Sequence, residues 1–588
     1  MCGIAGWLYA TGSEPAPESL ARMAQAIRHR GPDDEGFFRD GSAGLALAHR
    51  RLCIIDLSSA SHQPMVDAAS GVVLAYNGEL YNFHALRREL QALGHAFNSA
   101  GDTEVLLRSY LQWGMDCLPR LAGMFAFALW DPRDATLHLA RDAMGMKPLY
   151  FAPSTHGVAF ASEVKAFLQL PGFVGRPDTV GLQQFLEFGY VFEEGRTSLQ
   201  GVQKLAPGQR LALRGGKVVE RVTWFTPAAP DVADRRDEGE RVAELTATLG
   251  QVVTEHLIAD VPVGMLLSGG LDSSVLAALA ARQGPLTTIC MGFGGSDVDE
   301  RAHARQVAEH IGSRHIDVLI TPQEVMAEVQ SGAWVFDDLF ADWGTISTRL
   351  LYRRCREMGL KVVLVGEGAD ELFGGYDVFR QPPGMGLWQQ FRLYQRYAGR
   401  RHGKLFGPFR EAMADYLAAG QGDAFHAVRL FESRRQLPNQ YVMKVDKASM
   451  AESVEARAPF LDRRVADLAY RTPKEWLLRG GENKYLLRAL GRQNSLLPQS
   501  ISGRRKFGAP LAASWMDDDP EFRAFARGLI LAKGSQTDQL ALAPAMREYF
   551  CNGKAGYAWP SAVSVFRNLA WRLLLLELWA ARYLASSQ

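Results

Sequence analysis

The sequence predicts two domains, the first of the α+β class and the second of the α/β class. In the N-terminal third of the chain the apolar segments are short, strand-like and separated by polar turns, whereas farther on strands and helices alternate. Between these parts, residues 227–240 are rich in proline and charge and nearly free of apolar side chains, as is typical of an exposed linker. We therefore expect domains over 2–215 and 241–588, joined by a linker over 216–240.

The N-terminal domain is predicted to contain stacked sheets with helices on the outside. Residues 71–76, 124–130 and 149–152 are apolar or alternating and end at Asn-Gly, Asp-Pro or Pro, which favours strands. Residues 20–28 and 83–93 carry apolar side chains at intervals of three and four, which favours helices. Because strands outnumber helices, the sheets are expected to pack on each other and to be covered by those helices.

The second domain is predicted to be built on a parallel sheet with a helical C-terminal part. Strand-like and helix-like segments alternate there, in the order 263–267, 274–281, 286–291, 301–311, 349–358 and 361–365. This alternation is typical of βαβ units, whose strands are parallel. The last apolar stretch, 569–584, is interrupted by Arg572, Glu577 and Arg582, so we expect an amphipathic packing helix rather than a membrane span.

Composition excludes several function classes. The 588 residues carry 65 Lys and Arg against 64 Asp and Glu, a net charge of +1, so we expect no broad affinity for nucleic acid or for an anionic membrane. The six cysteines are scattered without a Cys-x-x-Cys pair, which argues against a disulfide framework or a zinc ribbon. The N-terminus lacks the basic and apolar regions of a signal peptide, so we expect a cytoplasmic protein.

Cys2 is a candidate nucleophile because of its position. If Met1 is removed, Cys2 carries a thiol and a free α-amine on one residue. The usual pKa is about 8.5 for the thiol and about 7.7–8.0 for the amine, so the amine can take the thiol proton near neutral pH. A separate histidine is then not needed to activate the thiol.

Four motifs follow Cys2 in order. They are His-Arg-Gly-Pro-Asp at 29–33, His-Arg-Arg-Leu at 49–52, Tyr-Asn-Gly-Glu-Leu-Tyr-Asn at 76–82 and Gly-Asp-Thr-Glu at 101–104. Together with 141–142 and 147–150, they make the whole first domain resemble the glutamine amidotransferase domain of the asparagine synthetase family, an N-terminal-nucleophile hydrolase. The resemblance implies an αββα sandwich in which Cys2 attacks the side-chain amide of glutamine.

The same resemblance implies roles for the other residues of this site. The Asn77 side chain and the Gly78 N–H would hold the oxyanion, a task that needs two fixed donors aimed at one oxygen. Glutamine would be bound by Arg51, Asn77, Gly78, Glu79 and Asp102. Arg51 would hold the α-carboxylate, which suits a planar guanidinium, and Asp102 would hold the α-ammonium group.

A Ser-Gly-Gly-Leu-Asp-Ser-Ser sequence at 268–274 follows a predicted strand and opens a helix. Small residues let the backbone fold around an anion, and a helix N-terminus directs unpaired N–H groups at it. The sequence matches neither the phosphate loop Gly-x-x-x-x-Gly-Lys nor the dinucleotide-binding fingerprint. It resembles the pyrophosphate loop of ATP pyrophosphatases, which adenylate a substrate and release pyrophosphate.

A further segment, 363–376, resembles a second signature of the asparagine synthetase family. The resemblance implies ATP and Mg²⁺ as cofactors, with Mg²⁺ held by Asp272 and Asp370. It implies Glu367 as the base for ammonia and Lys506 as the cation that neutralises charge at the α-phosphate. The nucleotide would be bound by Leu266, Ser268, Gly269, Gly270, Asp272, Ser273, Met291, Val365 and Gly366.

Joined, the two halves predict glutamine-dependent amidation of a carboxylate through an acyl-adenylate. Ammonia released at Cys2 would cross the protein to the adenylate, and a dry passage would keep it from being protonated. A match to the family at 455–462 implies that small side chains border this passage. The expected partners are glutamine, ATP and a carboxylate acceptor, and some relatives form homodimers.

The sequence departs from the family pattern in two places: the first removes a hydroxyl near the nucleotide, whose binding we expect to persist through backbone contacts, and the second lies where the acceptor is expected. Val365 stands where relatives usually have Ser, and 337–348 lacks the prolines of many relatives and carries Trp343 in place of a smaller residue. L-Aspartate is the default acceptor, and the alternative is another carboxylate, such as a sugar acid, a peptide or an antibiotic precursor. A β-lactam-forming relative that needs no ammonia and a scaffold with degenerate sites both fit less well, because the residues of both sites are present.

Overall fold

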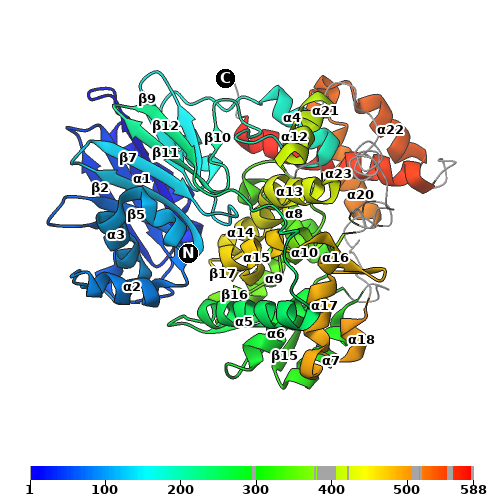
Figure 1. The fold of residues 1–588 in the computed structure, drawn as a ribbon. Coiled ribbons are helices and arrows are strands. Elements are labelled where there is room, and N and C mark those ends of the chain that lie inside the picture. Colours follow the sequence, from blue (N-terminus) through cyan, green and yellow to red (C-terminus); the bar gives the residue numbers. More distant parts are fainter. Residues whose placement is uncertain are drawn as a thin grey trace.

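The N-terminal part of the computed structural model is a sandwich of helix, sheet, sheet and helix (Figure 1). The structure describes residues 2–293, 299–376, 379, 406–419, 423–504, 516, 519–552 and 560–584. One sheet has the order β10 (Gln203–Lys204), β8 (Tyr150–Pro153), β9 (Gly157–Ala161), β1 (Cys2–Tyr9), β3 (Leu45–Arg51), β2 (Asp34–Asp40). The other has the order β12 (Lys217–Thr223), β11 (Gln209–Arg214), β7 (Thr136–Arg141), β6 (Gly123–Asp131), β5 (Val73–Leu80), β4 (Met65–Val66).

Successive side chains of a strand point to opposite sides of its sheet, and strands β1, β3, β5 and β6 are buried on both sides. In β1, Ile4 and Leu8 lie in the apolar core between the sheets, whereas Ala5 and Trp7 belong to the core that includes α1 (Pro17–Ala26). Leu74 of β5 packs in the outer core with α2 (Phe83–Ala92) and α3 (Asp102–Trp113). The predicted αββα sandwich is therefore confirmed.

The second part is built on a parallel sheet, as predicted. Its order is β15 (Arg314–Leu319), β14 (Thr287–Gly292), β13 (Val263–Leu266), β16 (Val362–Leu364), β17 (Glu455–Arg457), with every neighbouring pair parallel. The segments between these strands contain α6 (Leu271–Ala281), α7 (Arg301–Ile311), α8 (Pro322–Phe336) and α9 (Thr345–Glu357). The segments that the sequence pattern indicates correspond to β13, α6, β14, α7, α9 and β16, whereas β15, α8 and β17 are not indicated by it. Strand β15 carries Arg314, His315 and Asp317 among its apolar residues, and β17 has only three residues.

Helices surround this sheet and make up the C-terminal region (Figure 1). They include α5 (Glu238–His256), α10 (Ala369–Phe373), α12 (Phe406–Ala419), α13 (Ala424–Phe431), α14 (Val442–Ala451), α15 (Arg463–Arg471), α16 (Lys474–Leu477), α17 (Tyr485–Arg492), α18 (Gln499–Ser502), α20 (Pro520–Ile530), α21 (Gln536–Gln539), α22 (Ala543–Asn552) and α23 (Pro560–Tyr583). A hairpin of β18 (Leu478–Arg479) and β19 (Glu482–Asn483) lies among them. Within the described residues, none of the helices is both long and apolar enough to cross a membrane.

Two helices of the first part, α3 and α4 (Thr179–Phe188), are not indicated by the sequence pattern. The reason for α3 is that polar residues such as Asp102 and Glu104 are buried along with its apolar ones, so it has no clear polar face. The range expected as a linker begins with β12, which pairs with β11, and ends as α5 begins. Residues 224–237, between β12 and α5, form neither helix nor strand.

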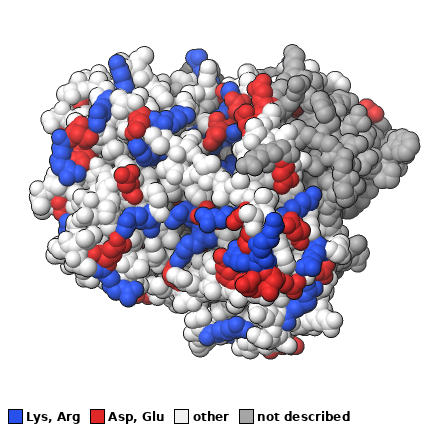
Figure 2. Space-filling view, in the orientation of Figure 1, with Lys and Arg blue, Asp and Glu red and all other residues white. Residues whose placement is uncertain are grey.

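The surface carries both signs of charge. Figure 2 shows Lys and Arg side chains interspersed with Asp and Glu side chains on the face in view. Some of them form ion pairs, such as Arg236 with Glu244 at 2.6 Å. This mixture agrees with the net charge of +1.

Asp337 lies at a buried junction between the two parts of the chain. Its side chain is 0% exposed, and its carboxylate accepts hydrogen bonds from the backbone N–H groups of Val164 and Lys165. From the second part, Lys447 of α14 and the Tyr583 hydroxyl of α23 donate to the same carboxylate, each at 3.0 Å. One carboxylate therefore holds the first part, α14 and α23 together.

We expect Asp337→Ala to lower the free energy of unfolding by about 3–5 kcal/mol, because the Lys447 ammonium group loses its nearest carboxylate in a buried site. Denaturation in guanidinium chloride measures this change. The control is Asp134→Ala, which removes an exposed ion pair with Arg214 (2.9 Å) and should change the free energy by less than about 1 kcal/mol. Equal effects of the two substitutions would contradict the role of the junction.

Candidate functional site

Strands β1, β3 and β5 bring the candidate residues of the first part together. In β5 the odd-numbered residues face the other sheet, which places Asn77 and Glu79 between the sheets. Cys2 faces the same space, since it has the parity of the inward residues of β1, and it is the register partner of Arg51 in β3. The backbone N–H of Cys2 donates to Asn77 Oδ1 at 3.0 Å.

The Asn77 amide directs a free donor into this space. Its oxygen accepts from Cys2, whereas its buried Nδ2 has no hydrogen-bond partner among the described residues. A buried donor without a partner is available to an oxygen that becomes negative during a reaction. Next to it, an added Cβ at Gly78 would lie 2.3 Å from the Met124 carbonyl oxygen and 2.8 Å from Phe125 Cα, so the strand pairing requires glycine there.

Burial shifts the pKa values of the Cys2 thiol and of His49, two groups of this site that could donate or accept a proton. It raises the pKa of the Cys2 thiol to about 11, although the positive charge of Arg51 opposes the shift. Burial also lowers the pKa of His49 to about 3, and its Nε2 lies 3.0 Å from the Tyr76 carbonyl oxygen. At neutral pH the thiol is therefore protonated and His49 is a weak base, so another base is needed to form the thiolate.

Two acidic side chains, Glu79 and Asp102, also belong to this site. Burial, with the negative charges of Asp102 and Glu455 nearby, raises the pKa of Glu79 well above its usual range. Burial also raises the pKa of Asp102, even though the Tyr76 hydroxyl and the Leu80 N–H donate to its carboxylate, each at 2.9 Å. Such a cluster favours a cationic group, because a nearby positive charge would stabilise the ionised carboxylates.

The remaining glutamine-binding candidate, Arg51, is buried and held by the loop that follows β3. Its guanidinium donates to the Ser58 carbonyl oxygen at 2.9 Å and to the Asp56 carbonyl oxygen. Two acceptors leave other N–H groups of the planar guanidinium for a ligand. The structure thus brings Cys2 and Arg51, on the paired strands β1 and β3 of one sheet, together with Asn77, Gly78 and Glu79 on β5 of the other sheet, and places Asp102 at the first residue of α3.

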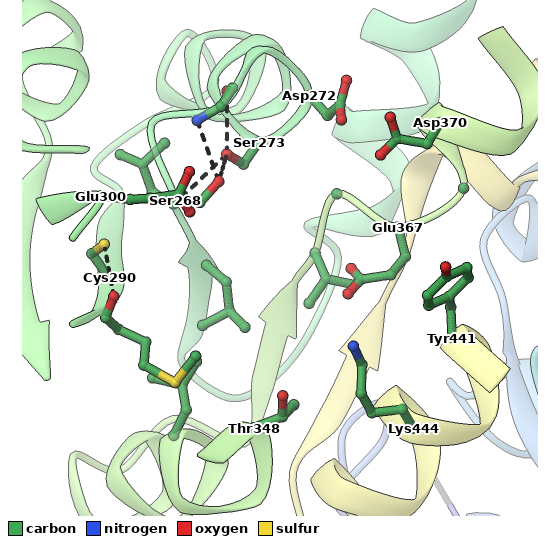
Figure 3. Close-up of a pocket in the computed structure, with 18 of the residues that line it drawn as sticks. Ser268, Asp272, Ser273, Cys290, Glu300, Thr348, Glu367, Asp370, Tyr441 and Lys444 are labelled. Atoms are coloured by element: carbon green, nitrogen blue, oxygen red, sulfur yellow. Dashed lines mark hydrogen bonds between the residues drawn. The ribbon is translucent and has the colours of Figure 1, made fainter. Parts of the chain in front are cut away.

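The second candidate site is a cavity of about 360 Å³ at the carboxyl ends of β13, β14 and β16 (Figure 3). This is the edge of a parallel sheet where ligands usually bind. Of the predicted nucleotide-binding residues, all except Gly269 line the cavity, and so do Glu367 and Asp370. The predicted residue Lys506 lies outside the described part of the chain.

Two serines shape the loop between β13 and α6. The Ser273 hydroxyl accepts a hydrogen bond from the Ser268 N–H at 3.2 Å and lies 3.1 Å from the Ser268 hydroxyl (Figure 3). Gly269 has a φ of +68°, and an added Cβ there would lie 2.6 Å from the Ala304 backbone nitrogen. Gly269 therefore acts on the loop geometry, and Gly270, Asp272 and Ser273, at the N-terminus of α6, line the cavity.

Asp272 and Asp370 both line the cavity, and their carboxylates face each other (Figure 3). Lys484 lies between them, with Nζ 2.5 Å from Asp272 Oδ2 and 2.6 Å from Asp370 Oδ1. Among the residues that the structure describes, no group of three or more His, Cys, Asp or Glu side chains could hold a metal alone. Two carboxylates that already bind a cation fit Mg²⁺, which usually takes one or two carboxylates plus phosphate oxygens and water.

On the far side of the cavity, Glu367 and Lys444 point toward each other (Figure 3). Burial raises the pKa of Glu367, and the ammonium group of Lys444 partly opposes this shift. Burial alone would lower the pKa of Lys444, but Asp342, which accepts from its Nζ at 3.1 Å, and Glu367 raise it. Lys444 therefore stays charged, and Glu367 is a carboxylate with a pKa nearer to neutrality.

The two ends of segment 337–348, which departs from the family pattern, lie in different places. Asp337 belongs to the junction, whereas Thr348 lines the cavity. Trp343 stacks on Trp571 of α23, with ring centroids 4.6 Å apart, and donates to Asn568 Oδ1 at 3.1 Å. The large side chain therefore packs against the C-terminal helix and is not among the residues that line the cavity.

Several residues at the two sites have no sequence motif that identifies them. At the cavity these are Lys444, Lys484 and Tyr441. Three others, Thr348 and Tyr376 at the cavity and Glu455 at the first site, lie within segments 337–348, 363–376 and 455–462, to which the sequence assigns no individual role for them. One signal is present in α14, where Lys444, Asp446 and Lys447 interrupt a run of apolar residues. Charges at buried helical positions often mark a functional or paired site.

Comparisons with known proteins agree with this arrangement. A model of the glutamine amidotransferase domain matches residues 1–224, and a model of asparagine synthase matches residues 244–581. Asparagine synthetase [glutamine-hydrolyzing] 1 of Bacillus subtilis is 31% identical over 567 residues, covering 89% of this chain and 88% of its own. Asparagine synthetase B [glutamine-hydrolyzing] of Escherichia coli is 30% identical over 549 residues, covering 89% and 85%.

We expect Lys484→Met to lower the melting temperature, because Asp272 and Asp370 then repel each other without the ammonium group. Millimolar Mg²⁺ without nucleotide should raise the melting temperature of this variant at least about twofold more than that of the parent, since binding to the folded state stabilises it. Differential scanning calorimetry measures both shifts. Lys217→Met, at an exposed position of β12, is the control, and an equal Mg²⁺ shift in both variants would argue against a cation site here.

Proposed function

The chain belongs to the glutamine-hydrolysing asparagine synthetase family, whose members amidate with glutamine and ATP, and we propose that its acceptor is L-aspartate. The products would be L-asparagine, L-glutamate, AMP and pyrophosphate. The observation that carries the proposal is the pairing of two sites in one chain. One has a buried thiol beside a free amide donor, and the other is a cavity with facing carboxylates beside a helix N-terminus.

In the first half-reaction, Cys2 attacks the side-chain carbonyl of glutamine. The α-amine freed by removal of Met1 takes the thiol proton and passes it to the departing ammonia, while a thioester forms and the C–N bond breaks. Asn77 Nδ2 and the Gly78 N–H hold the oxyanion. Water then hydrolyses the thioester to release glutamate. The raised pKa of the Cys2 thiol supports this use of a separate base.

The charges around Cys2 suit the ends of glutamine. Arg51 offers N–H groups to the α-carboxylate, and the Glu79 and Asp102 carboxylates offer a negative site for the α-ammonium group. The ammonium group would relieve the repulsion that raises the pKa values of these two acids. Binding of a zwitterion is thus favoured at both ends.

In the second half-reaction, the acceptor carboxylate attacks the α-phosphate of ATP and pyrophosphate leaves. The Ser268–Ser273 loop and the start of α6 would bind the phosphates. Mg²⁺, when bound at Asp272 and Asp370, would supply positive charge against the phosphates. Lys506 would stabilise the charge at the α-phosphate. Glu367 would then take a proton from ammonia as it attacks the acyl-adenylate and AMP leaves, and its raised pKa suits a base.

The charges at the acceptor end of the cavity support aspartate. Lys444 can pair with a carboxylate, while Asp342, bonded to Lys444, and Glu371, in the cavity wall, can pair with an ammonium group. Aspartate carries two carboxylates and one ammonium group. A sugar acid has no ammonium group to place beside the negative charges of Asp342 and Glu371, whose contacts in the structure include Lys444 and the Tyr376 hydroxyl.

Replacing Cys2 separates the two half-reactions. We expect Cys2→Ala to lose glutamine-dependent amidation by about three orders of magnitude or more, because the nucleophile is gone, and to keep ammonia-dependent amidation. Cys53→Ala, at a half-buried cysteine, should keep both. Intact-protein mass spectrometry should show that Met1 is absent from the active enzyme. Survival of glutamine-dependent activity in Cys2→Ala, or retention of Met1, would make the assignment of the nucleophile wrong.

The acceptor is tested by pyrophosphate release with Mg-ATP, glutamine and a panel of carboxylates. We expect aspartate to give the highest kcat/KM, with one asparagine and one AMP formed per pyrophosphate, because its charges complement the cavity. The panel includes sugar acids, small peptides and malate, which lacks the ammonium group of aspartate. If another carboxylate gives the highest value, that carboxylate is the acceptor and the aspartate proposal fails.

A further inference from the structure

The backbone of Cys2 is held by an arginine that lies between the two halves of the chain. Arg30, the last residue of η1 (Arg28–Arg30), is 0% exposed. Its Nε donates to the Cys2 carbonyl oxygen at 3.1 Å. Its Nη1 donates to Glu163 Oε1 at 2.8 Å and to Asp446 Oδ2 at 2.8 Å, and its Nη2 donates to Asp446 Oδ1 at 3.0 Å. The guanidinium thus joins Cys2 to helix α14 of the second half.

Asp446 is the acid that fixes the orientation of this guanidinium. The two parallel hydrogen bonds from Arg30 form the bidentate geometry that is both strong and directional. Glu163 contributes only one hydrogen bond to Arg30, and it is also 2.6 Å from Lys165 and 3.7 Å from Lys447. Because Glu163 is shared among several cations, it cannot by itself determine where Arg30 points.

The Asp446 carboxyl group is ionised, as the ion pair with Arg30 requires. The side chain is buried, and the positive charges of Arg30 and of Lys147, at 3.5 Å, lower the pKa of its carboxyl despite burial. The carboxylate is therefore ionised at neutral pH. Without it, the Arg30 guanidinium would remain in a buried site with one shared carboxylate.

Helix α14 also forms part of the cavity in the second half. Lys444 lines that cavity, and Lys444 and Asp446 are two residues apart, so their side chains project about 200° apart around the helix. One short helix therefore contacts Cys2 through Arg30 on one side and the acceptor end of the cavity on the other.

We propose that Asp446 is a positioning residue for the glutamine-hydrolysing step, supplied by the synthetase half of the chain. By holding Arg30 against the Cys2 carbonyl, it fixes the main chain of the nucleophile relative to the Asn77 amide. A displacement of about 1 Å at such a site can lower the rate about 100-fold. The first site is then incomplete without α14. This inference rests on the proposed role of Cys2 as the nucleophile.

The test is Asp446→Asn, which keeps the side-chain size but places an amide NH₂ group against the guanidinium. Glutamate release from glutamine should fall about 10- to 100-fold in kcat, with KM for glutamine changed less than about threefold, because orientation rather than binding is lost. Ammonia-dependent amidation should stay within about twofold of the parent. Asp116→Asn, at an exposed position, is the matched control and should change neither activity.

A second variant keeps the test decisive if Asp446→Asn folds poorly. Arg30→Lys retains a positive charge but cannot make both the bidentate contact with Asp446 and the bond to the Cys2 carbonyl. It should show the same selective loss of kcat for glutamine. In the double variant the loss should be no greater than in the worse single variant, because both substitutions break one linkage.

Three outcomes are informative. A selective loss of glutamine-dependent kcat in both variants supports the inference. Equal loss of glutamine- and ammonia-dependent activity in both would mean that Asp446 serves only the packing of α14, and no loss would mean that Arg30 needs no partner; either overturns it. Cys2→Ala, measured alongside, separates this from failure of the proposed function, since only that failure leaves glutamine hydrolysis intact in Cys2→Ala.

Discussion

A charge that is removed from water must be paired, and this requirement governs the contact between the two halves of the chain. Glu163 lies between cations of both halves, Asp337 accepts from residues of both halves, and Asp446 of the second half binds Arg30 of the first. Buried ion pairs often add little net stability compared with apolar packing, yet each becomes costly when one partner is lost. Their main effect here is on geometry, because few relative placements of the halves satisfy all the charges at once.

The first site follows from the alternation of side chains in its strands. The space between the sheets is filled by apolar side chains at one end of β3 and β5, from Leu45 and Leu47 and from Val73 and Ala75, and by Ile4 and Leu8 of β1. Where Cys2, Arg51, Asn77 and Glu79 occupy the same inward positions, the apolar core gives way to a polar pocket. The rigid sheets thereby position the pocket without a flexible loop, which suits a site that must aim two donors at one oxygen.

The pair Asp272 and Asp370 and the pair Glu79 and Asp102 differ in how much positive charge lies beside their carboxyl groups. Asp272 and Asp370 have the Lys484 ammonium group between them, so a bound cation would compete with a side chain that is already in place. Glu79 and Asp102 have less compensation, with the Arg457 guanidinium 3.6 Å from Glu79, and their pKa values are raised. A cation that binds Asp272 and Asp370 would therefore replace the Lys484 ammonium group, whereas a cationic group that binds Glu79 and Asp102 would add positive charge where little is present.

The sequence by itself determined the two fold classes and the residues that carry motifs. Apolar periodicity indicated β5, β13, β16 and α7 because each is formed by contiguous residues with one dominant burial pattern, and α3 escaped because its polar residues are buried too. Motifs predicted Cys2, Asn77, Asp272 and Glu367, since these residues stand beside glycines and turns that are recognisable locally. Only the tertiary structure decided that Asp337, Asp446 and Lys484 are buried, that Lys444 is half-buried, and that all of them are paired, because their partners lie far away in the sequence. A pairing between distant charges leaves no local pattern, because it arises only when the chain folds: Lys444 and Lys484 find their partners within the second half, and Asp446 finds Arg30 across the two halves.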